Sequence, residues 1–261
     1  MAGYGWVSLT TDYGISDGYV AACHGVIARI APQLRVIDVT HQVAPGDVSR
    51  AAAVLAETLP QLPPAVHVAV VDPGVGTARR AVAVATPGAL LVGPDNGVLP
   101  WAADALGGAT AAVELTNPDW FQHPVSRTFH GRDIFAPVAA RLAAGAALAG
   151  AGPPLPLDRL VRLPDPVVSS GAGWLEAEVL TVDRFGNVQL AAPAAALAGF
   201  GNSVTAGGLP AVRGETFADA PAGGLVVLAD AANRVAVAVN GGRAAVVLGV
   251  APGDVLRIAA G

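Results

Sequence analysis

A carboxylate and two guanidinium groups lie close together in the segment after an apolar run near residue 70. The run 68–71 is mostly β-branched, which is typical of a buried strand, and a Pro-Gly pair follows Asp72. Asp72 therefore lies at the carboxyl end of the predicted strand, the edge at which open α/β sheets bind ligands. Arg79 and Arg80 follow in the same glycine-containing loop. This segment has the residues for a charged site, although a simple turn capped by Asp72 has the same composition.

Further polar residues stand at the ends of other apolar runs. Asp12 follows the run 6–11 and could accept two hydrogen bonds from a diol such as ribose, or it could serve a turn. His130 lies in a polar loop, where an imidazole can titrate. Asp133 is expected to be the N-cap of the helix that follows, with Arg132 as its ion partner. Asp12 and His130 are therefore candidates for chemistry, and Asp133 for structure.

The carboxyl-terminal third offers two more polar turns. Asp183 and Asn187 flank a glycine between two apolar runs, and Asn240 precedes Gly241-Gly242, a strong hairpin signal. Taken singly, each of these patterns predicts a hairpin and no chemistry.

The composition excludes several classes of mechanism. All 15 basic residues are arginine, so the chain has no phosphate-loop lysine, no Schiff-base lysine and no lysine general base. The single cysteine, Cys23, excludes an internal disulfide and a multi-cysteine zinc site. A net charge of -5 without a basic run argues against nucleic acid as a partner. No run is long and charge-free enough for a membrane span and no secretion signal is visible, so we expect a cytoplasmic protein.

The elements that position these residues form two domains. In the first, predicted strands alternate with helices, which indicates a mostly parallel sheet with helices on both faces. The strands are expected at 6–11, 34–39 and 67–72, with a hairpin of 81–86 and 90–92. The helices are expected from Asp17 to about Ile30, from Asp47 to about Leu59, and from about Asp133 to Leu148. This α/β domain is assigned to residues 1–160.

The second domain follows a proline-rich segment. Residues 161–172 are predicted to be a linker, and residues 173–261 a small all-β barrel built from short runs separated by Gly, Asn and Asp. The runs lie at 174–182, 186–190, 203–205, 210–212, 224–228, 234–240, 244–249 and 254–258.

Seven motifs, in their order along the chain, carry a resemblance to a known family. They are the segments 10–14 (TTDYG), 38–41 (DVTH), 71–80 (VDPGVGTARR), 93–97 (GPDNG), 128–135 (TFHGRDIF), 183–187 (DRFGN) and 238–241 (AVNG). Together they resemble the S-adenosyl-L-methionine hydrolases, or SAM hydroxide adenosyltransferases, relatives of the fluorinases and chlorinases. The resemblance extends from about residue 6 to residue 258.

The resemblance implies an α/β domain followed by a β-barrel domain. It also implies a homotrimer with substrate bound between neighbouring subunits, and cleavage of S-adenosylmethionine by water into adenosine and L-methionine. The family's Asp-Arg-His triad matches Asp72, Arg79 and His130, and its ribose-binding aspartate matches Asp12. The remaining matches are substrate-binding positions: Asp183 and Asn187 for the methionine end, Phe217 and Asn240 around the adenine, and Gly131 beside the triad.

The expected chemistry needs little from the protein. The leaving group is a neutral thioether expelled from a sulfonium, so no general acid is required, and the site has to align a poorly solvated water. Arg79 stays protonated and can stabilise developing hydroxide. His130 could accept the proton or orient the water, with Asp72 fixing either His130 or Arg79. No cofactor and no metal are expected.

Halogenating relatives lack the Arg-His pair, and the fluorinase has a serine at the position of Gly131, so water is the expected nucleophile. The positions of Ala231 and Ala232 usually help to hold the methionine carboxylate or adenine, which leaves Arg234 or backbone N–H groups for that task. A halide-using enzyme and a module that binds adenosine or S-adenosylmethionine without turnover remain alternatives. So does a metallohydrolase built on His41, His67, His123 and His130, although these histidines lack a short ligand spacing.

Overall fold

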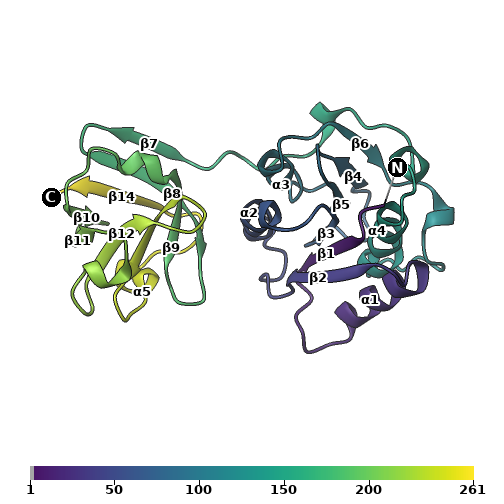
Figure 1. Cartoon of the computed structure of the whole chain (residues 1–261), viewed down its shortest axis with the longest axis horizontal. Helices are drawn as coiled ribbons and strands as arrows, with labels where there is room; N and C mark the ends of the chain where they lie inside the picture. The colour runs from purple at the N-terminus through teal and green to yellow at the C-terminus, as the bar shows by residue number, and fades with distance from the viewer. Residues whose placement is uncertain (1–2) are drawn as a thin grey trace. The chain divides into compact units, whose positions relative to one another are not determined.

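The computed structural model describes residues 3–261, and the chain divides into two compact units at the Leu163–Pro164 junction. Figure 1 shows the helices and strands of each unit. Each unit has its own hydrophobic core. The first is an α/β domain and the second is a β-barrel, as the sequence predicts.

The α/β domain is built on a six-stranded sheet with the order β2-β1-β3-β5-β4-β6. Strands β2, β1, β3 and β5 are parallel, whereas β4 runs antiparallel to β5 and β6. The strand bounds are Trp6–Thr11 (β1), Arg35–Thr40 (β2), Val66–Val70 (β3), Ala81–Ala85 (β4), Leu90–Pro94 (β5) and Ala111–Glu114 (β6). The predicted mostly parallel sheet and the β4–β5 hairpin are confirmed.

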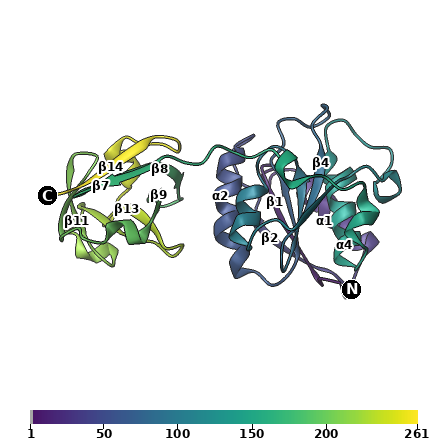
Figure 2. The ribbon, with the colours of Figure 1, turned by 90° about the horizontal axis from the view of Figure 1, so that it is seen from above.

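Helices cover both faces of this sheet. Their bounds are Tyr19–Ile30 (α1), Val48–Thr58 (α2), Pro100–Ala105 (α3) and Ala136–Ala143 (α4). Figure 2 shows α2 on one face and α1 with α4 on the other. The α1–α4 side buries residues such as Leu9, Ile27 and Phe135, and the α2 side buries Leu55 and Leu91. The buried apolar surface on both faces holds the strand ends in place, and Asp12, Asp72 and Arg79 stand on the loops that follow β1 and β3.

The second unit is a closed barrel. Strand β14 pairs with β10 and also with β8, so strands β8 to β14 form a ring of seven, and β7 pairs with β8 alone. The bounds are Val168–Gly171 (β7), Trp174–Val182 (β8), Val188–Pro193 (β9), Ser203–Ala206 (β10), Leu209–Arg213 (β11), Leu225–Ala229 (β12), Arg234–Val239 (β13) and Val255–Ala260 (β14). Short helix α5 (Ala244–Leu248) lies between β13 and β14.

Four local expectations differ from the structure. The run 244–249 is helix α5, because its apolar residues meet the barrel end on one side only, with Ala244 buried and Val246 73% exposed. Residues 168–171 of the predicted linker pair with β8 as strand β7. The helix expected from Asp133 to Leu148 begins as α4 at Ala136 and ends at Ala143. Asp17 is not the cap of α1, whose N-cap is Gly18.

None of the described helices is both long and apolar enough to cross a bilayer.

Candidate functional site

The loop after β3 carries a buried ion pair between Asp72 and Arg79. Arg79 Nε donates to both carboxylate oxygens of Asp72 at 3.0 Å, and Nη2 donates to Oδ2. The side chains are 4% and 12% exposed, respectively. Because both oxygens of Asp72 are held by one guanidinium, the carboxylate fixes the orientation of Arg79. Of the two roles left open for Asp72, the structure therefore supports the one in which it holds Arg79.

His130 completes the triad from another loop. Arg79 Nη2 lies 2.8 Å from His130 Nδ1, and a guanidinium has no lone pair to share, so Nδ1 is the acceptor. An imidazole that accepts at Nδ1 carries its proton on Nε2 and is neutral. Burial, followed by the positive charge of Arg79, holds the pKa of His130 below its ordinary value. The structure thus brings Asp72, Arg79 and His130 into one hydrogen-bonded chain.

The two loops meet where Gly76 touches the backbone before His130. Gly76 has φ of +75°, and a Cβ there would lie 2.2 Å from the carbonyl oxygen of Arg127. Only glycine allows both the left-handed backbone and this close approach.

A buried carboxylate organises the segment around His130. Asp133 lies in a π-helical turn, Gly131–Phe135, that precedes α4. Its Oδ2 accepts the Ser126 N–H at 2.8 Å, and Arg132 Nε donates to Oδ1 at 2.6 Å. The predicted ion pair with Arg132 is confirmed. The predicted N-cap role is wrong, because the carboxylate reaches back to the loop at Ser126 instead of capping α4.

Asp12 borders a hollow of about 450 Å³ in the same domain. The Gly46 N–H donates to Asp12 Oδ2 at 2.9 Å, and within residues 3–261 no donor is bonded to Oδ1. The lining residues are Asp12, Tyr13, Tyr19, Ser126, Thr128, Phe129 and Arg132. A carboxylate oxygen at the edge of a partly aromatic hollow is suited to a sugar diol.

Three aromatic rings form a wall of this hollow. The ring centroids of Tyr13 and Phe129 are 5.6 Å apart, those of Tyr19 and Phe129 are 5.2 Å apart, and those of Tyr13 and Tyr19 are 5.9 Å apart. The sequence analysis assigned no role to these residues. Two of them stand inside the motifs at 10–14 and 128–135, which is the signal that could have identified them.

Gly131 is required by the position of Tyr13. A Cβ at Gly131 would lie 2.1 Å from the Tyr13 hydroxyl oxygen. Burial, followed by the nearby Cys23, Asp12 and Asp72, raises the pKa of Tyr13, so the phenol remains protonated. The space that a serine side chain would occupy beside His130 is therefore filled by a neutral phenol.

The predicted substrate residues of the barrel lie on two turns. Asp183 Oδ1 accepts the backbone N–H of Asn187 at 2.8 Å, and Asn187 Nδ2 donates to Asp183 Oδ2 at 2.8 Å. Phe217 is 52% exposed on a short 3-10 turn, and Asn240 Nδ2 donates to the carbonyl of Ala220 at the end of that turn. Asp183 and Asn187 thus shape their own hairpin turn, while Phe217 projects into solvent.

Arg234 is engaged within the barrel. Its Nη1 donates to the Ala191 carbonyl at 2.8 Å, and its backbone N–H donates to Asp230 Oδ1. The Ala232 N–H also donates to Asp230 Oδ1. The Arg234 side chain and the backbone N–H groups of Ala232 and Arg234, which were expected to hold the methionine carboxylate, therefore already make hydrogen bonds within the barrel.

Of the four histidines considered for a metallohydrolase, only His41 belongs to a cluster of potential ligands within the described chain. His67 is buried and bonded to Ser8 Oγ at 2.7 Å, and burial lowers its pKa to about 4. His123 Nε2 lies 2.9 Å from the Pro118 carbonyl oxygen.

Fold and site together define a two-domain protein of one class: an α/β domain with a partly buried Asp-Arg-His chain and a partly aromatic hollow of about 450 Å³, followed by a closed β-barrel. The chain belongs to the SAM hydroxide adenosyltransferase family. The model of that family's N-terminal domain matches residues 7–152, and the model of its C-terminal domain matches residues 177–257.

Individual relatives agree with this family. An (R)-S-adenosyl-L-methionine hydrolase of Salinispora arenicola is 65% identical over 261 residues, the full length of both chains. A crystal structure of an uncharacterised conserved protein from Thermotoga maritima superimposes with a TM-score of 0.88 at 37% identity, covering 97% of this chain and 99% of that one. A fluorinase of an Actinoplanes species is 30% identical over 209 residues, 70% of each chain.

Proposed function

We propose that this chain hydrolyses S-adenosyl-L-methionine to adenosine and L-methionine by attack of water on the ribose 5′ carbon. The observation that carries the proposal is the hydrogen-bonded Asp72–Arg79–His130 chain, together with Asp12, which lies near Tyr13 as Asp72 and Arg79 do. Full-length identity of 65% to a protein named (R)-S-adenosyl-L-methionine hydrolase supports the reaction, and the fluorinase is more distant.

In the proposed step, the water oxygen forms a bond to C5′ as the C5′–S bond breaks. The electron pair of that bond passes to sulfur, which leaves as the neutral thioether of methionine. One proton is released to solvent for each turnover. The chemistry thus needs alignment of water and stabilisation of its developing negative charge, and no proton donor for the leaving group.

Arg79 is the residue suited to that stabilisation. Asp72 and His130 engage its Nε and Nη2, and among the described residues no acceptor is bonded to Nη1. The Nη1 N–H groups can therefore donate to the attacking oxygen. Since Nδ1 of His130 already accepts from Arg79, His130 acts as a positioning residue, and the proton of water leaves to solvent.

The other proposed contacts are to the two ends of the substrate. Asp12 accepts from the ribose hydroxyls, with the Tyr13, Tyr19 and Phe129 wall against the nucleoside. Gly131 keeps Tyr13 in that wall. Phe217 and Asn240 hold the adenine, while Asp183 and Asn187 shape the turn that receives the methionine end.

The assembly in this proposal is a homotrimer in which a barrel of one subunit completes the site of its neighbour. Exposed Phe185 (74%) and Phe217 on the barrel, and exposed Tyr19 beside the hollow, favour such an interface. No cofactor, nucleic acid or membrane takes part, and a cytoplasmic location fits the free thiol of Cys23.

Chromatography of S-adenosylmethionine incubated with the pure protein, with and without chloride, tests the reaction. Equal amounts of adenosine and methionine, unchanged by chloride, are expected. A 5′-chloro nucleoside would make the chain a halide-using enzyme, and bound but intact substrate would make it a binding module.

A further inference from the structure

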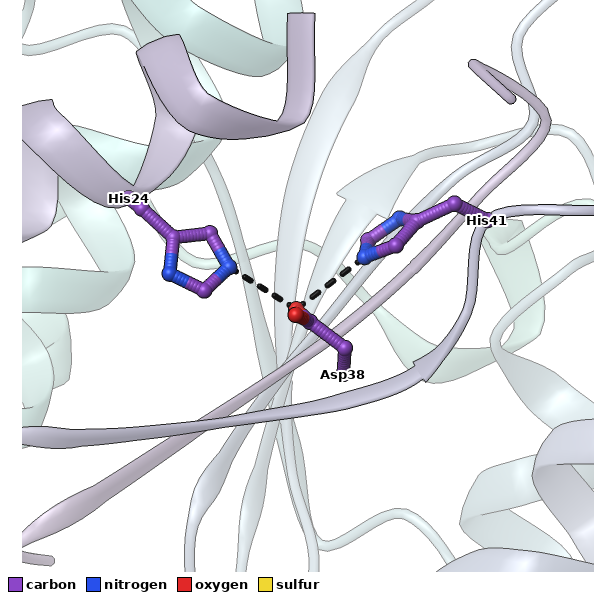
Figure 3. Close-up of side chains that lie close together, drawn as sticks. All are labelled: His24, Asp38 and His41. Atoms are coloured by element: carbon purple, nitrogen blue, oxygen red, sulfur yellow. Dashed lines mark hydrogen bonds and ion pairs between the residues drawn. The ribbon is translucent and has the colours of Figure 1, made fainter. Parts of the chain in front are cut away.

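Two imidazoles and a carboxylate that are not part of the triad converge at the end of β2. His24 Nε2 on α1 lies 2.8 Å from Asp38 Oδ1, and His41 Nε2 lies 3.0 Å from the same oxygen. Figure 3 shows the two rings approaching the carboxylate from opposite sides. The three ligand atoms lie within 4.8 Å of one another, and within residues 3–261 this is the single such group.

The contact of His41 with Asp38 does not have the geometry of a directed hydrogen bond. The His41 side chain is 6% exposed, and its Nε2 makes no directed hydrogen bond to any described group, although it faces Oδ1. The other ring nitrogen, Nδ1, lies 2.9 Å from Thr11 Oγ1. When Nδ1 carries the proton and donates it to Thr11, Nε2 turns a lone pair toward a carboxylate. In that tautomer two electron-rich groups face each other, and one cation can bind both of them.

We propose that His24, Asp38 and His41 bind one Zn²⁺ ion. Imidazole nitrogen and carboxylate oxygen are zinc ligands at about 2.0–2.2 Å, which places tetrahedral ligand atoms about 3.3 Å apart. The two His–Asp separations of 2.8 Å and 3.0 Å need to open by only a few tenths of an ångström, and the two imidazole nitrogens, which lie within 4.8 Å of each other, need to approach the same spacing. Thr11 supplies the outer hydrogen bond that fixes a metal-bound histidine.

The donor set selects the class of metal. Two imidazoles with one carboxylate suit Zn²⁺ and similar transition metals, whereas Mg²⁺ and Ca²⁺ prefer oxygen ligands. The side chains of His24 and Asp38 are 35% and 43% exposed, so a fourth position opens to water.

The expectation of no metal rested on the absence of a short ligand spacing. Here an Asp-x-x-His pair gains its third ligand from α1, the helix that precedes β2 in the chain.

The site would brace the loop that carries Asp12. The carbonyl of His41 accepts the Gly14 N–H at 2.7 Å, and Thr11 Oγ1 also accepts the Tyr13 N–H at 3.2 Å. A metal on His41 therefore ties the end of β2 to the turn after β1. The site does not depend on the reaction catalysed nearby.

Isothermal titration of the chelator-treated full chain with ZnCl₂ tests the proposal. We expect one Zn²⁺ per chain, with binding weakened at least about 100-fold in Asp38→Asn and in His24→Ala. His123→Ala removes a histidine outside the cluster and is the matched control, with binding unchanged. Circular dichroism establishes that each variant is folded, and His24→Gln is a second, milder replacement on the surface of α1.

Thermal unfolding provides a separate readout. Zinc at 100 times its Kd should raise the Tm of the wild-type chain by roughly 5–10 °C, and should leave the Tm of the His24 and Asp38 variants unchanged. Zinc binding that persists at full strength in both variants would overturn the proposal. So would a wild-type chain that takes up no zinc, because the cluster would then be an ion pair only.

Discussion

Arg79 donates from Nη2 to Nδ1 of His130 over 2.8 Å, across a sequence separation of 51 residues. This hydrogen bond fixes the tautomer of the histidine and the direction of the guanidinium at once, because Asp72 holds the other side of Arg79. Because His130 accepts a hydrogen bond from Arg79 in the resting enzyme, the structure favours a positioning role for His130 over a general-base role.

If His130 positions Arg79, a side chain that retains an acceptor should replace it. We expect His130→Asn, whose Oδ1 takes the position of Nδ1, to keep activity within about tenfold of wild type, and His130→Ala to lose about 100-fold or more in kcat with little change in KM. Adenosine release measured by chromatography gives both constants. Equal, complete loss in the two variants would assign the proton-accepting role to His130 instead.

Arg79 should be the most sensitive position. Arg79→Lys keeps the charge but cannot span Asp72, His130 and a water together, so kcat should fall about 10²–10³-fold. Binding of S-adenosylmethionine, measured by calorimetry, should change far less than kcat. Arg141→Lys, at a partly exposed arginine on α4 that donates to the Asp119 carbonyl, is the control. Near-normal turnover in Arg79→Lys would contradict the mechanism.

Removal of the Asp72 carboxylate should cost stability as well as activity. Asp72→Ala leaves the buried guanidinium of Arg79 without its partner, and we expect a loss of about 3–5 kcal/mol in the free energy of unfolding. Urea unfolding followed by circular dichroism measures this loss. An unchanged urea midpoint would show that the pair contributes no net stability.

Gly131 should not tolerate a side chain. Gly131→Ser has to displace the Tyr13 ring, with a cost of about 1–3 kcal/mol in stability and roughly 10–100-fold in kcat. Gly25→Ala is the matched control: a Cβ at this exposed position of α1 has nothing within 4 Å, so the change should be neutral or stabilise by about 0.5–1 kcal/mol. A fully active, equally stable Gly131→Ser protein would refute the assigned packing.

His67 should make the fold sensitive to acid. Burial lowers its pKa to about 4, whereas the unfolded chain binds the proton near 6.5. Between these two values the unfolded state holds more protons, so stability is complete above pH 6.5 and declines as the pH falls towards 4, by on the order of 3 kcal/mol. Urea midpoints at pH 7 and pH 4.5 should differ less in His67→Leu than in wild type. An equal difference would exclude His67 as the cause.

Much of the fold can be predicted from the sequence because a local pattern of residues defines each of these strands and helices. The predicted strand 6–11 is β1 residue for residue, and 174–182 is β8, since both are apolar runs with clear ends. The run 244–249 was mistaken for a strand because a short apolar run does not distinguish a strand from a short helix that is buried on one side.

The motifs identify the triad, but the sequence does not show which residues touch. That Asp72 holds Arg79 and not His130 depends on a contact between two loops at Gly76 and Arg127, distant in sequence. The role of Asp133 was missed for the same reason: its partner Ser126 precedes it in a loop whose path no local pattern predicts. Likewise, the grouping of His24 with Asp38 and His41 arises from the packing of α1 beside β2.

Isotope labelling tests the central claim most directly. S-adenosylmethionine is incubated with the pure protein in oxygen-18 water, and the nucleoside and amino acid products are analysed by mass spectrometry. Attack of water on the 5′ carbon predicts adenosine that carries one heavy oxygen at its 5′ hydroxyl, together with unlabelled methionine. Adenosine without the label, or a label in any other product, would contradict the proposed reaction.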